Sequence, residues 1–307
     1  MYIIMNKFIT INCLTPDLHK YKIEYNVNLA NTSSTILIHG FNDFHYNKLL
    51  HEKIIANKSN VFLLTLRNYN GLQEREPQFY TNNLKDYFHE INDTIEKITN
   101  LTPIAGKDIY LMGHSTGGLI SIAYCHEGIY KSKITKLILN SPFLDFNNSF
   151  IEELYLKTIG QFIGYFFPLT CLNATKIDIS YPKWINENIS KDLQTKDFIE
   201  VMNSTHSTVN VSGKYYGWMY AVHHYHWLIQ NNYIKLNIPI HVFQSNKTGI
   251  GGDNTLDTTE IKNYSSLLTD KNGVINRYVI INGFHNVFSS DEVARTQAFG
   301  LLDKIYA

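Results

Sequence analysis

The sequence predicts an α/β fold in which a mostly parallel central sheet is covered by helices on both faces. Short apolar segments alternate with longer helical segments along most of the 307 residues, and this alternation is typical of a parallel sheet built from βαβ units. Several strand segments are apolar throughout, as expected of strands buried on both faces. With 44% hydrophobic residues, the chain can bury one large core.

The first half of the chain contains five predicted strands. Tyr21 to Val27 alternates as a half-buried strand does, whereas Thr35 to Gly40 is a buried strand that ends in a turn. The next strands are expected at residues 61–66, 109–112 and 134–139, and the helices at about 45–57, 80–99 and 116–127.

The alternating pattern stops at Ser141-Pro142 and resumes at Ile238. A strand at 238–243, a helix from about 258, a strand at 276–281 and a helix at about 290–305 complete the expected sheet. The segment between the two halves is much too long for a simple crossover. Residues 143–220 are therefore expected to form an inserted, mainly helical cap on a core made of residues 1–142 and 221–307.

Charge and hydropathy narrow the choice of partners. The 27 basic and 27 acidic residues balance, so we expect no nucleic-acid partner. The most apolar later stretch, Phe150 to Phe167, contains charged residues, which argues against stable membrane insertion. The N-terminus lacks the pattern of a signal peptide, and the three cysteines suggest neither a disulfide framework nor metal binding. These features favour a cytoplasmic location.

One motif carries most of the chemical information. The chain passes from an apolar strand through Gly113-His114-Ser115-Thr116-Gly117 into the start of a helix. This is the Gly-x-Ser-x-Gly pattern of a nucleophile elbow, a turn so sharp that side chains at the two glycine positions would collide with it. Ser115 is therefore predicted to be the nucleophile of a serine hydrolase, which needs no metal and no cofactor.

A serine hydroxyl needs an imidazole to accept its proton and a carboxylate to orient that imidazole. His285 follows the last predicted strand in a glycine-containing loop and is the expected general base. The acid should follow the strand at 238–243. Asp253 is the first carboxylate there and is preferred, and Asp257 is the alternative unless it caps the next helix.

The tetrahedral intermediate of such a reaction needs two backbone N–H donors. Thr116, directly after the nucleophile, is one expected donor, and Phe41, in the loop after the strand that ends at Gly40, is the other. His39 is expected to be a structural hydrogen-bonding residue, since the triad already has a base.

These stretches resemble the α/β-hydrolase family of the lysophospholipase and monoacylglycerol-lipase type, also described as serine aminopeptidase-like. The resemblance implies an α/β-hydrolase fold with a helical cap, an esterase activity and a triad of Ser115, Asp253 and His285. It departs where Asn286 follows the histidine and where Asn68 and Asn70 replace glycine-rich sequence. The matching stretches are Ile38 to Asp43, Leu66 to Gly71, Gly113 to Gly118, Asn140 to Asp145, Asp253 to Asp257 and Gly283 to Ser289.

Hydrolysis of a small-molecule carboxylic ester, of a lipid or another apolar acyl compound, is the function this pattern favours. A peptidase or amidase on the same fold, and a non-catalytic binding protein, are the alternatives. In the cap, Phe162 and Phe166 are expected to line an acyl pocket, with Gly164 as a point of close approach; simple packing of these rings is the alternative. His223, His224 and His226 are expected to pack between cap and core rather than bind a metal.

Overall fold

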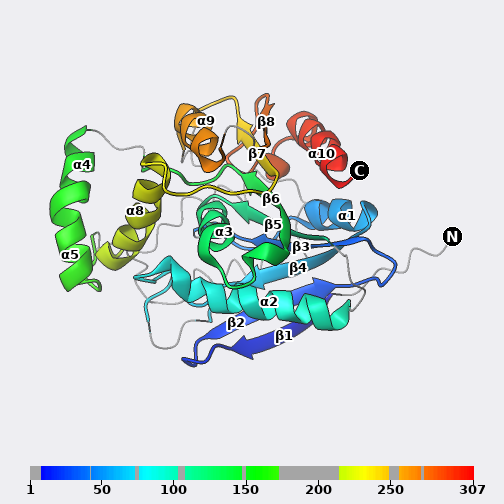
Figure 1. Cartoon of the computed structure of the whole chain (residues 1–307), viewed down its shortest axis with the longest axis horizontal. Helices are drawn as coiled ribbons and strands as arrows, with labels where there is room; N and C mark the ends of the chain where they lie inside the picture. Colours follow the sequence, from blue (N-terminus) through cyan, green and yellow to red (C-terminus); the bar gives the residue numbers. More distant parts are fainter. Residues whose placement is uncertain are drawn as a thin grey trace.

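A computed structural model describes residues 8–41, 43–72, 76–102, 108–146, 150–172, 214–248, 256–270 and 273–307. Its centre is an eight-stranded sheet in the order β1-β2-β4-β3-β5-β6-β7-β8 (Figure 1). All neighbouring strands from β4 to β8 pair in parallel, and only the β1–β2 and β2–β4 pairs are antiparallel. The expected α/β class and mostly parallel sheet are therefore confirmed. The strands are β1 (Ile9–Leu14), β2 (Lys20–Asn26), β3 (Ser33–Ile38), β4 (Ser59–Thr65), β5 (Asp108–His114), β6 (Ile134–Asn140), β7 (Ile240–Ser245) and β8 (Ile275–Ile280).

Helices cover both faces of the sheet (Figure 1). Alternate side chains of the central strands divide between two apolar clusters, so that Ile36 and Leu37, for example, lie on opposite faces. Helices α2, α3, α8 and α9 pack on the first face, and α1 and α10 pack on the second. Their bounds are α1 (Lys48–Ala56), α2 (Phe88–Leu101), α3 (Thr116–Glu127), α8 (Tyr216–Gln230), α9 (Thr258–Ser265) and α10 (Glu292–Tyr306), with short 3₁₀ turns η1 (Leu84–Tyr87), η2 (Lys131–Lys133), η6 (Ser266–Leu268) and η7 (Val287–Ser289).

The segment after β6 departs from the sheet, as expected of an insertion. It contains α4 (Phe150–Tyr155), a π-helical turn η3 (Leu156–Gly160) and α5 (Gln161–Phe166), which continue one another and stand away from the sheet (Figure 1). Helix α8 then lies between α5 and the core. Because α8 runs through residue 220, the expected boundary between cap and core falls inside this helix.

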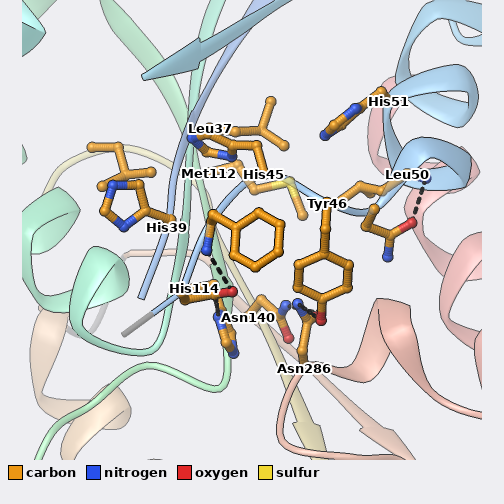
Figure 2. A pocket seen from close by; sticks show the side chains of 14 residues that line it. Leu37, His39, His45, Tyr46, Leu50, His51, Met112, His114, Asn140 and Asn286 are labelled. Atoms are coloured by element: carbon orange, nitrogen blue, oxygen red, sulfur yellow. Dashed lines mark hydrogen bonds and ion pairs between the residues drawn. The ribbon is translucent and has the colours of Figure 1, made fainter. Parts of the chain in front are cut away.

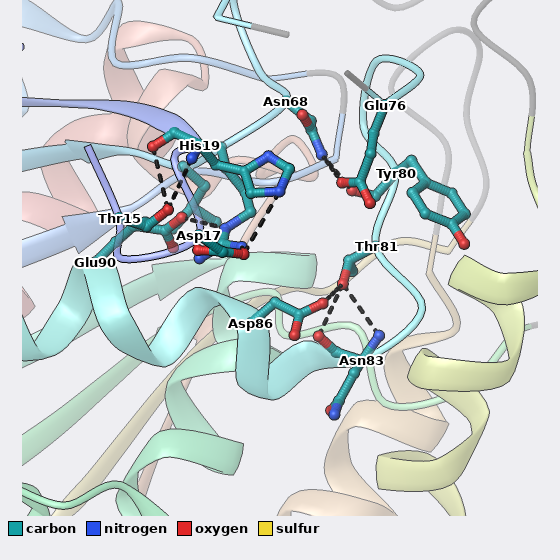
Figure 3. Close-up of polar contacts among 12 residues, drawn as sticks. Thr15, Asp17, His19, Asn68, Glu76, Tyr80, Thr81, Asn83, Asp86 and Glu90 are labelled. Carbon is teal, nitrogen blue, oxygen red and sulfur yellow. Dashed lines mark hydrogen bonds and ion pairs between the residues drawn. The ribbon is translucent and has the colours of Figure 1, made fainter. Parts of the chain in front are cut away.

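The loop after β4 is fixed by a buried ion pair. The Arg67 side chain is 3% exposed, and its Nε and Nη1 donate to Glu90 of α2 at 2.7 Å and to Asp17 of the β1–β2 turn at 2.8 Å. Figure 3 shows these two carboxylates together with Asn68, whose side chain donates to Glu76 and to the Tyr80 carbonyl. This loop therefore has a defined course at the end of β4.

Strand β1 was not expected from the sequence. Its residues are mostly exposed or half-buried at the sheet edge, so it lacks the continuous apolar run that marks the inner strands. Among the described residues, no helix combines the length and the hydropathy that crossing a bilayer requires.

Candidate active site

Ser115 occupies a strained turn between β5 and α3. Its φ of +52° and ψ of −118° lie in a region that residues other than glycine rarely adopt. A Cβ atom at Gly113 would lie 2.3 Å from the Gly117 carbonyl oxygen, and one at Gly117 would lie 2.4 Å from the carbonyl oxygens of Ile38 and His39. Both glycines are thus required by sterics, and the turn has the geometry of a nucleophile elbow.

Strand β6 supports this turn from the side. The Ser115 N–H donates to the Asn140 carbonyl at 3.0 Å, and the Ser115 carbonyl accepts from the Phe143 N–H at 3.0 Å and the Gly118 N–H at 2.9 Å. Both the N–H and the carbonyl of Ser115 are therefore hydrogen-bonded, which fixes the backbone of this residue.

The two expected oxyanion donors flank the serine. Thr116 is the first residue of α3, where N–H groups have no partner within the helix. On the other side, a Cβ at Gly40 would lie 3.1 Å from the Ser115 Cβ, so the loop that carries Phe41 approaches the nucleophile closely. No hydrogen bond between described residues uses the N–H of Phe41 or of Thr116.

His39 has a structural position. Its Nε2 accepts from the Leu66 N–H at 3.2 Å, so Nδ1 carries the proton and donates to the Gly40 carbonyl at 3.0 Å. Burial lowers the pKa of His39 to about 3. The ring therefore stays neutral and anchors the start of the oxyanion loop, as its position in the sequence suggests.

His285 lies in the loop after β8, with its ring centroid 4.8 Å from that of His114. Burial holds the pKa of His285 well below its usual range, with a smaller contribution from the charge of His114. The imidazole is consequently neutral at pH 7, which is the form that a general base requires.

The loop that carries His285 forms two hydrogen bonds with the side chain of Asn140, the last residue of β6. The Asn140 Nδ2 donates to the Asn286 Oδ1 at 2.8 Å, and the Val287 N–H donates to the Asn140 Oδ1 at 3.2 Å. Asn140 therefore supports Ser115 through its carbonyl and the histidine loop through its side chain. Asn286, which replaces the acidic residue of the family pattern, completes this neutral amide pair.

The two candidate acids of the predicted triad, Asp253 and Asp257, follow β7 in the chain. Asp253 lies outside the described residues. Asp257 is the N-cap of α9, and its Oδ1 accepts from the Thr259 N–H at 2.6 Å and the Glu260 N–H at 3.4 Å. The side chain of Asp257 thus performs the capping role that was its alternative, and Asp253 stays the predicted acid.

Sequence reasoning missed a buried pair directly behind the nucleophile. The Asp43 Oδ2 lies 2.6 Å from Nδ1 of His114, the residue that precedes Ser115. Burial raises the pKa of Asp43, but its hydrogen bonds to His114 and to the Phe44 N–H, together with the charges of His114 and His39, outweigh this effect and leave the pKa below its usual value. The pair borders a cavity of about 40 Å³, and Figure 2 shows His114, Asn140 and Asn286 close together among its lining residues. The only available signal was an acidic residue placed shortly after His39-Gly40.

An aromatic surface adjoins the oxyanion loop. The Phe41 ring lies 4.6 Å from Trp218 of α8 and 5.0 Å from Phe79, measured between centroids. Phe143 and Phe146, in the loop after β6, extend this group at 6.3 and 6.4 Å from Trp218. The ring of Phe41 therefore packs against aromatic side chains of α8 and the core loops, of which Trp218 and Phe79 are buried.

The two cap residues singled out in the sequence lie farther out on α5. Phe162 and Phe166 are 60% and 58% exposed and contact each other at 4.8 Å. Gly164 provides the expected close approach, because a Cβ there would lie 2.6 Å from the Tyr216 carbonyl of α8. Their role in binding an acyl chain stays a prediction.

The histidines of α8 show packing contacts. His226 is buried, its Nε2 lies 3.0 Å from the Phe143 carbonyl, and burial lowers its pKa to about 3. His224 has an edge-to-face contact with Tyr225. Within the described ranges, no three side chains of the types that bind metals come together.

Comparison with known proteins agrees with this geometry. The family model described as serine aminopeptidase, S33, matches residues 33–253. No curated protein is similar enough in sequence to count as a relative.

Solved structures match over nearly the whole chain. A soluble variant of the Saccharomyces cerevisiae monoglyceride lipase, in complex with a substrate analogue, is 16% identical, with a TM-score of 0.70 over 100% of this chain and 96% of that one. A carboxyl esterase from Bacillus coagulans in complex with glycerol is 13% identical, with a TM-score of 0.65 over 97% of each chain. The Paleococcus ferrophilus monoacylglycerol lipase is 15% identical, with a TM-score of 0.58 over 98% of each chain. At these identities the likeness establishes the α/β-hydrolase fold.

Proposed function

The chain belongs to the serine aminopeptidase S33 family of α/β-hydrolase-fold enzymes, and from this premise we propose that it hydrolyses carboxylic esters with an apolar acyl group, such as those of lipids. The observation that carries the proposal is the strained Ser115 at the head of α3, which directly precedes Thr116 and is closely approached by Gly40 of the loop that carries Phe41. The neutral His285, whose ring lies 4.8 Å from that of His114, is assigned as the base. A strained residue of this kind persists only where the surrounding structure enforces it.

In the proposed reaction, the Ser115 hydroxyl attacks the ester carbonyl while His285 accepts its proton. The N–H groups of Phe41 and Thr116 bind the resulting oxyanion. The alcohol leaves with the proton from His285, and the acyl group stays on Ser115. Water then attacks the acyl-enzyme with His285 as base, and Asp253 is assigned to orient the imidazole and stabilise its charged form.

The aromatic surface beside the oxyanion loop supports an apolar acyl group. Phe41, Phe143, Phe146 and Trp218 would contact the first carbons of the chain, and Phe162 and Phe166 would contact a longer chain. The names of the solved structures with this fold, a carboxyl esterase and two monoglyceride or monoacylglycerol lipases, support an ester substrate.

An aminopeptidase would need a carboxylate available to bind the substrate amine. In the part of the chain that the structure describes, Glu153 forms an ion pair with Lys157, but burial and the nearby Asp145, Asp257 and Glu153 raise the pKa of Glu260 to about 7. Carboxylates therefore lie near the cap, and the anilide arm of the following test decides between an ester and a peptide substrate.

The test combines a fluorophosphonate probe with p-nitrophenyl esters of increasing acyl length and an aminoacyl p-nitroanilide. We expect labelling at Ser115, ester turnover and little anilide turnover. Ser115→Ala should abolish labelling while the protein stays folded. Labelling of a different serine would contradict the nucleophile assignment, and a wild-type protein without labelling or turnover would be a binding protein on this fold.

A further inference from the structure

Asp43 and His114 connect the two halves of the site. The Asp43 side chain is 3% exposed, and its Oδ2 lies 2.6 Å from Nδ1 of His114. The same oxygen accepts from the Gly40 N–H at 3.3 Å, and Oδ1 accepts from the Phe44 N–H at 2.8 Å. One carboxylate thus links the residue before the nucleophile to the loop that carries the Phe41 donor.

In this arrangement both the N–H and the carbonyl of Gly40 are hydrogen-bonded. Its N–H bonds to Asp43, and its carbonyl accepts from His39 Nδ1. In a trans peptide the carbonyl and the following N–H point in opposite directions. Fixing the Gly40 carbonyl on His39 therefore directs the Phe41 N–H away from His39, and the contact between Gly40 and Ser115 places that donor beside the nucleophile.

We propose that Asp43 and His114 are positioning residues that hold the Gly40–Phe41 peptide in the orientation needed to bind the oxyanion. The inference rests on the proposed ester hydrolysis. Neither side chain needs to touch the substrate: Asp43 is buried, and Nδ1 of His114 is engaged by Asp43.

The expected effect follows from how strictly an oxyanion hole depends on geometry. Removing one donor costs roughly 10²- to 10³-fold in kcat, and displacing a group by about 1 Å can cost roughly 10²-fold. Loss of the pair should leave the Phe41 N–H present but less well directed, so a loss of about 10- to 100-fold is expected.

The test uses Asp43→Asn, Asp43→Glu and His114→Gln in the full chain. The matched control is His51→Gln, because His51 is buried and lines the same cavity but makes none of the hydrogen bonds to Gly40 or Asp43 described above. For each variant we would measure kcat and KM with p-nitrophenyl butyrate, inhibition by an alkyl trifluoromethyl ketone, and the melting temperature. The ketone forms a tetrahedral oxyanion on the serine, and so reports on the oxyanion hole.

We expect Asp43→Asn and His114→Gln to lower kcat about 10- to 100-fold, to change KM less than about twofold and to weaken ketone inhibition by the same factor as kcat/KM. Asp43→Glu, which keeps the charge, should recover part of the loss. His51→Gln should keep kcat within about twofold of wild type, even if its melting temperature falls.

Unchanged kcat in both pair variants, or unchanged ketone inhibition alongside a lower kcat, would overturn the positioning role. If Asp43→Asn does not fold, His114→Gln decides. Failure of this proposal differs from failure of the proposed function, because in the latter case the wild-type protein itself would show neither ester turnover nor labelling at Ser115.

Discussion

The elbow around Ser115 and the outer cap helix α5 both depend on a glycine at a close approach, but the approaches have different consequences. Gly117 lets α3 approach the carbonyl oxygens of Ile38 and His39, next to the strained Ser115. Gly164 lets α5 contact the Tyr216 carbonyl of α8. The first approach lies beside the predicted nucleophile, whereas the second lies between two packed helices.

The side chains around Gly117 and Gly164 also differ in their hydrogen bonding and exposure. Near Ser115 the neighbouring polar groups are joined by hydrogen bonds through Asn140, Asp43 and His114. On α5 the adjacent Phe162 and Phe166 are largely exposed. The surroundings of Ser115 are therefore constrained by backbone and side-chain hydrogen bonds, whereas the exposed rings of α5 have fewer neighbours to fix them.

The largest expected effect is the fall in kcat when a residue of the predicted triad is replaced, compared with replacement of the nearby carboxylate of Asp257. His285→Ala should lower kcat by roughly 10⁴- to 10⁶-fold, because the serine loses its base. Asp257→Asn should lower kcat less than about tenfold, since Asp257 caps α9. Asp253→Asn should resemble the histidine variant, at roughly 10⁴-fold. Steady-state kinetics of the three variants checks the ranking, and a larger loss for Asp257→Asn would transfer the acid role to that residue.

A second prediction concerns glycines as structural constraints. Gly117→Ala should destabilise the protein by about 3 kcal/mol, because its Cβ would meet backbone carbonyls that cannot move independently. Gly300→Ala in α10 is the matched control. A Cβ there has no atom within 4 Å, so alanine should stabilise that helix by about 0.5–1 kcal/mol. Urea denaturation measures both, and similar values for the two variants would contradict the steric account of the elbow.

The pH dependence of kcat/KM tests the state of His285. The pKa of its imidazole in the folded free enzyme lies well below the usual 6.5, so the neutral base persists as the pH falls. Activity should be fully present at pH 7 and should decline only when the pH falls well below 6.5. A half-maximal point at or above pH 6.5 would show that the base is less buried than this site requires.

The secondary structure could be predicted best from the sequence where steric constraints and burial leave a clear residue pattern. The elbow, the inner strands and the helices from 116 to 127 and from 292 to 306 follow from apolar runs and glycine positions, and they lie within a few residues of the expected bounds. Strand β1 was missed because an edge strand buries too little to show a pattern.

The Asp43–His114 pair was missed for a different reason. Its partners are 71 residues apart, and a hydrogen bond between distant residues has no periodicity in the sequence. His285 and Ser115, by contrast, follow strands whose order fixes where they lie. The positions of Ser115 and His285 could thus be predicted from topology and their catalytic roles stay predictions, while the Asp43–His114 contact required coordinates.

The smallest expected effect tests whether the cap surface contributes to substrate choice. Phe166→Ala should raise the activation free energy derived from kcat/KM by about 1 kcal/mol more for a long-chain ester than for an acetyl ester. The reason is that each buried methylene contributes about 0.8 kcal/mol and only the longer chain would reach α5. Since the Phe166 side chain is 58% exposed, its truncation leaves no large cavity, and the melting temperature should stay close to that of wild type.

Val293→Ala, an exposed position on α10, is the control for truncating a surface apolar residue far from the cap. It should change neither the acyl-length preference nor, by more than about 0.5 kcal/mol, the free energy of unfolding. A lowered melting temperature for Phe166→Ala with equal losses on both esters would mean that the ring only packs. A selective loss on the long ester would instead show that the exposed face of α5 distinguishes acyl chains that the elbow treats alike.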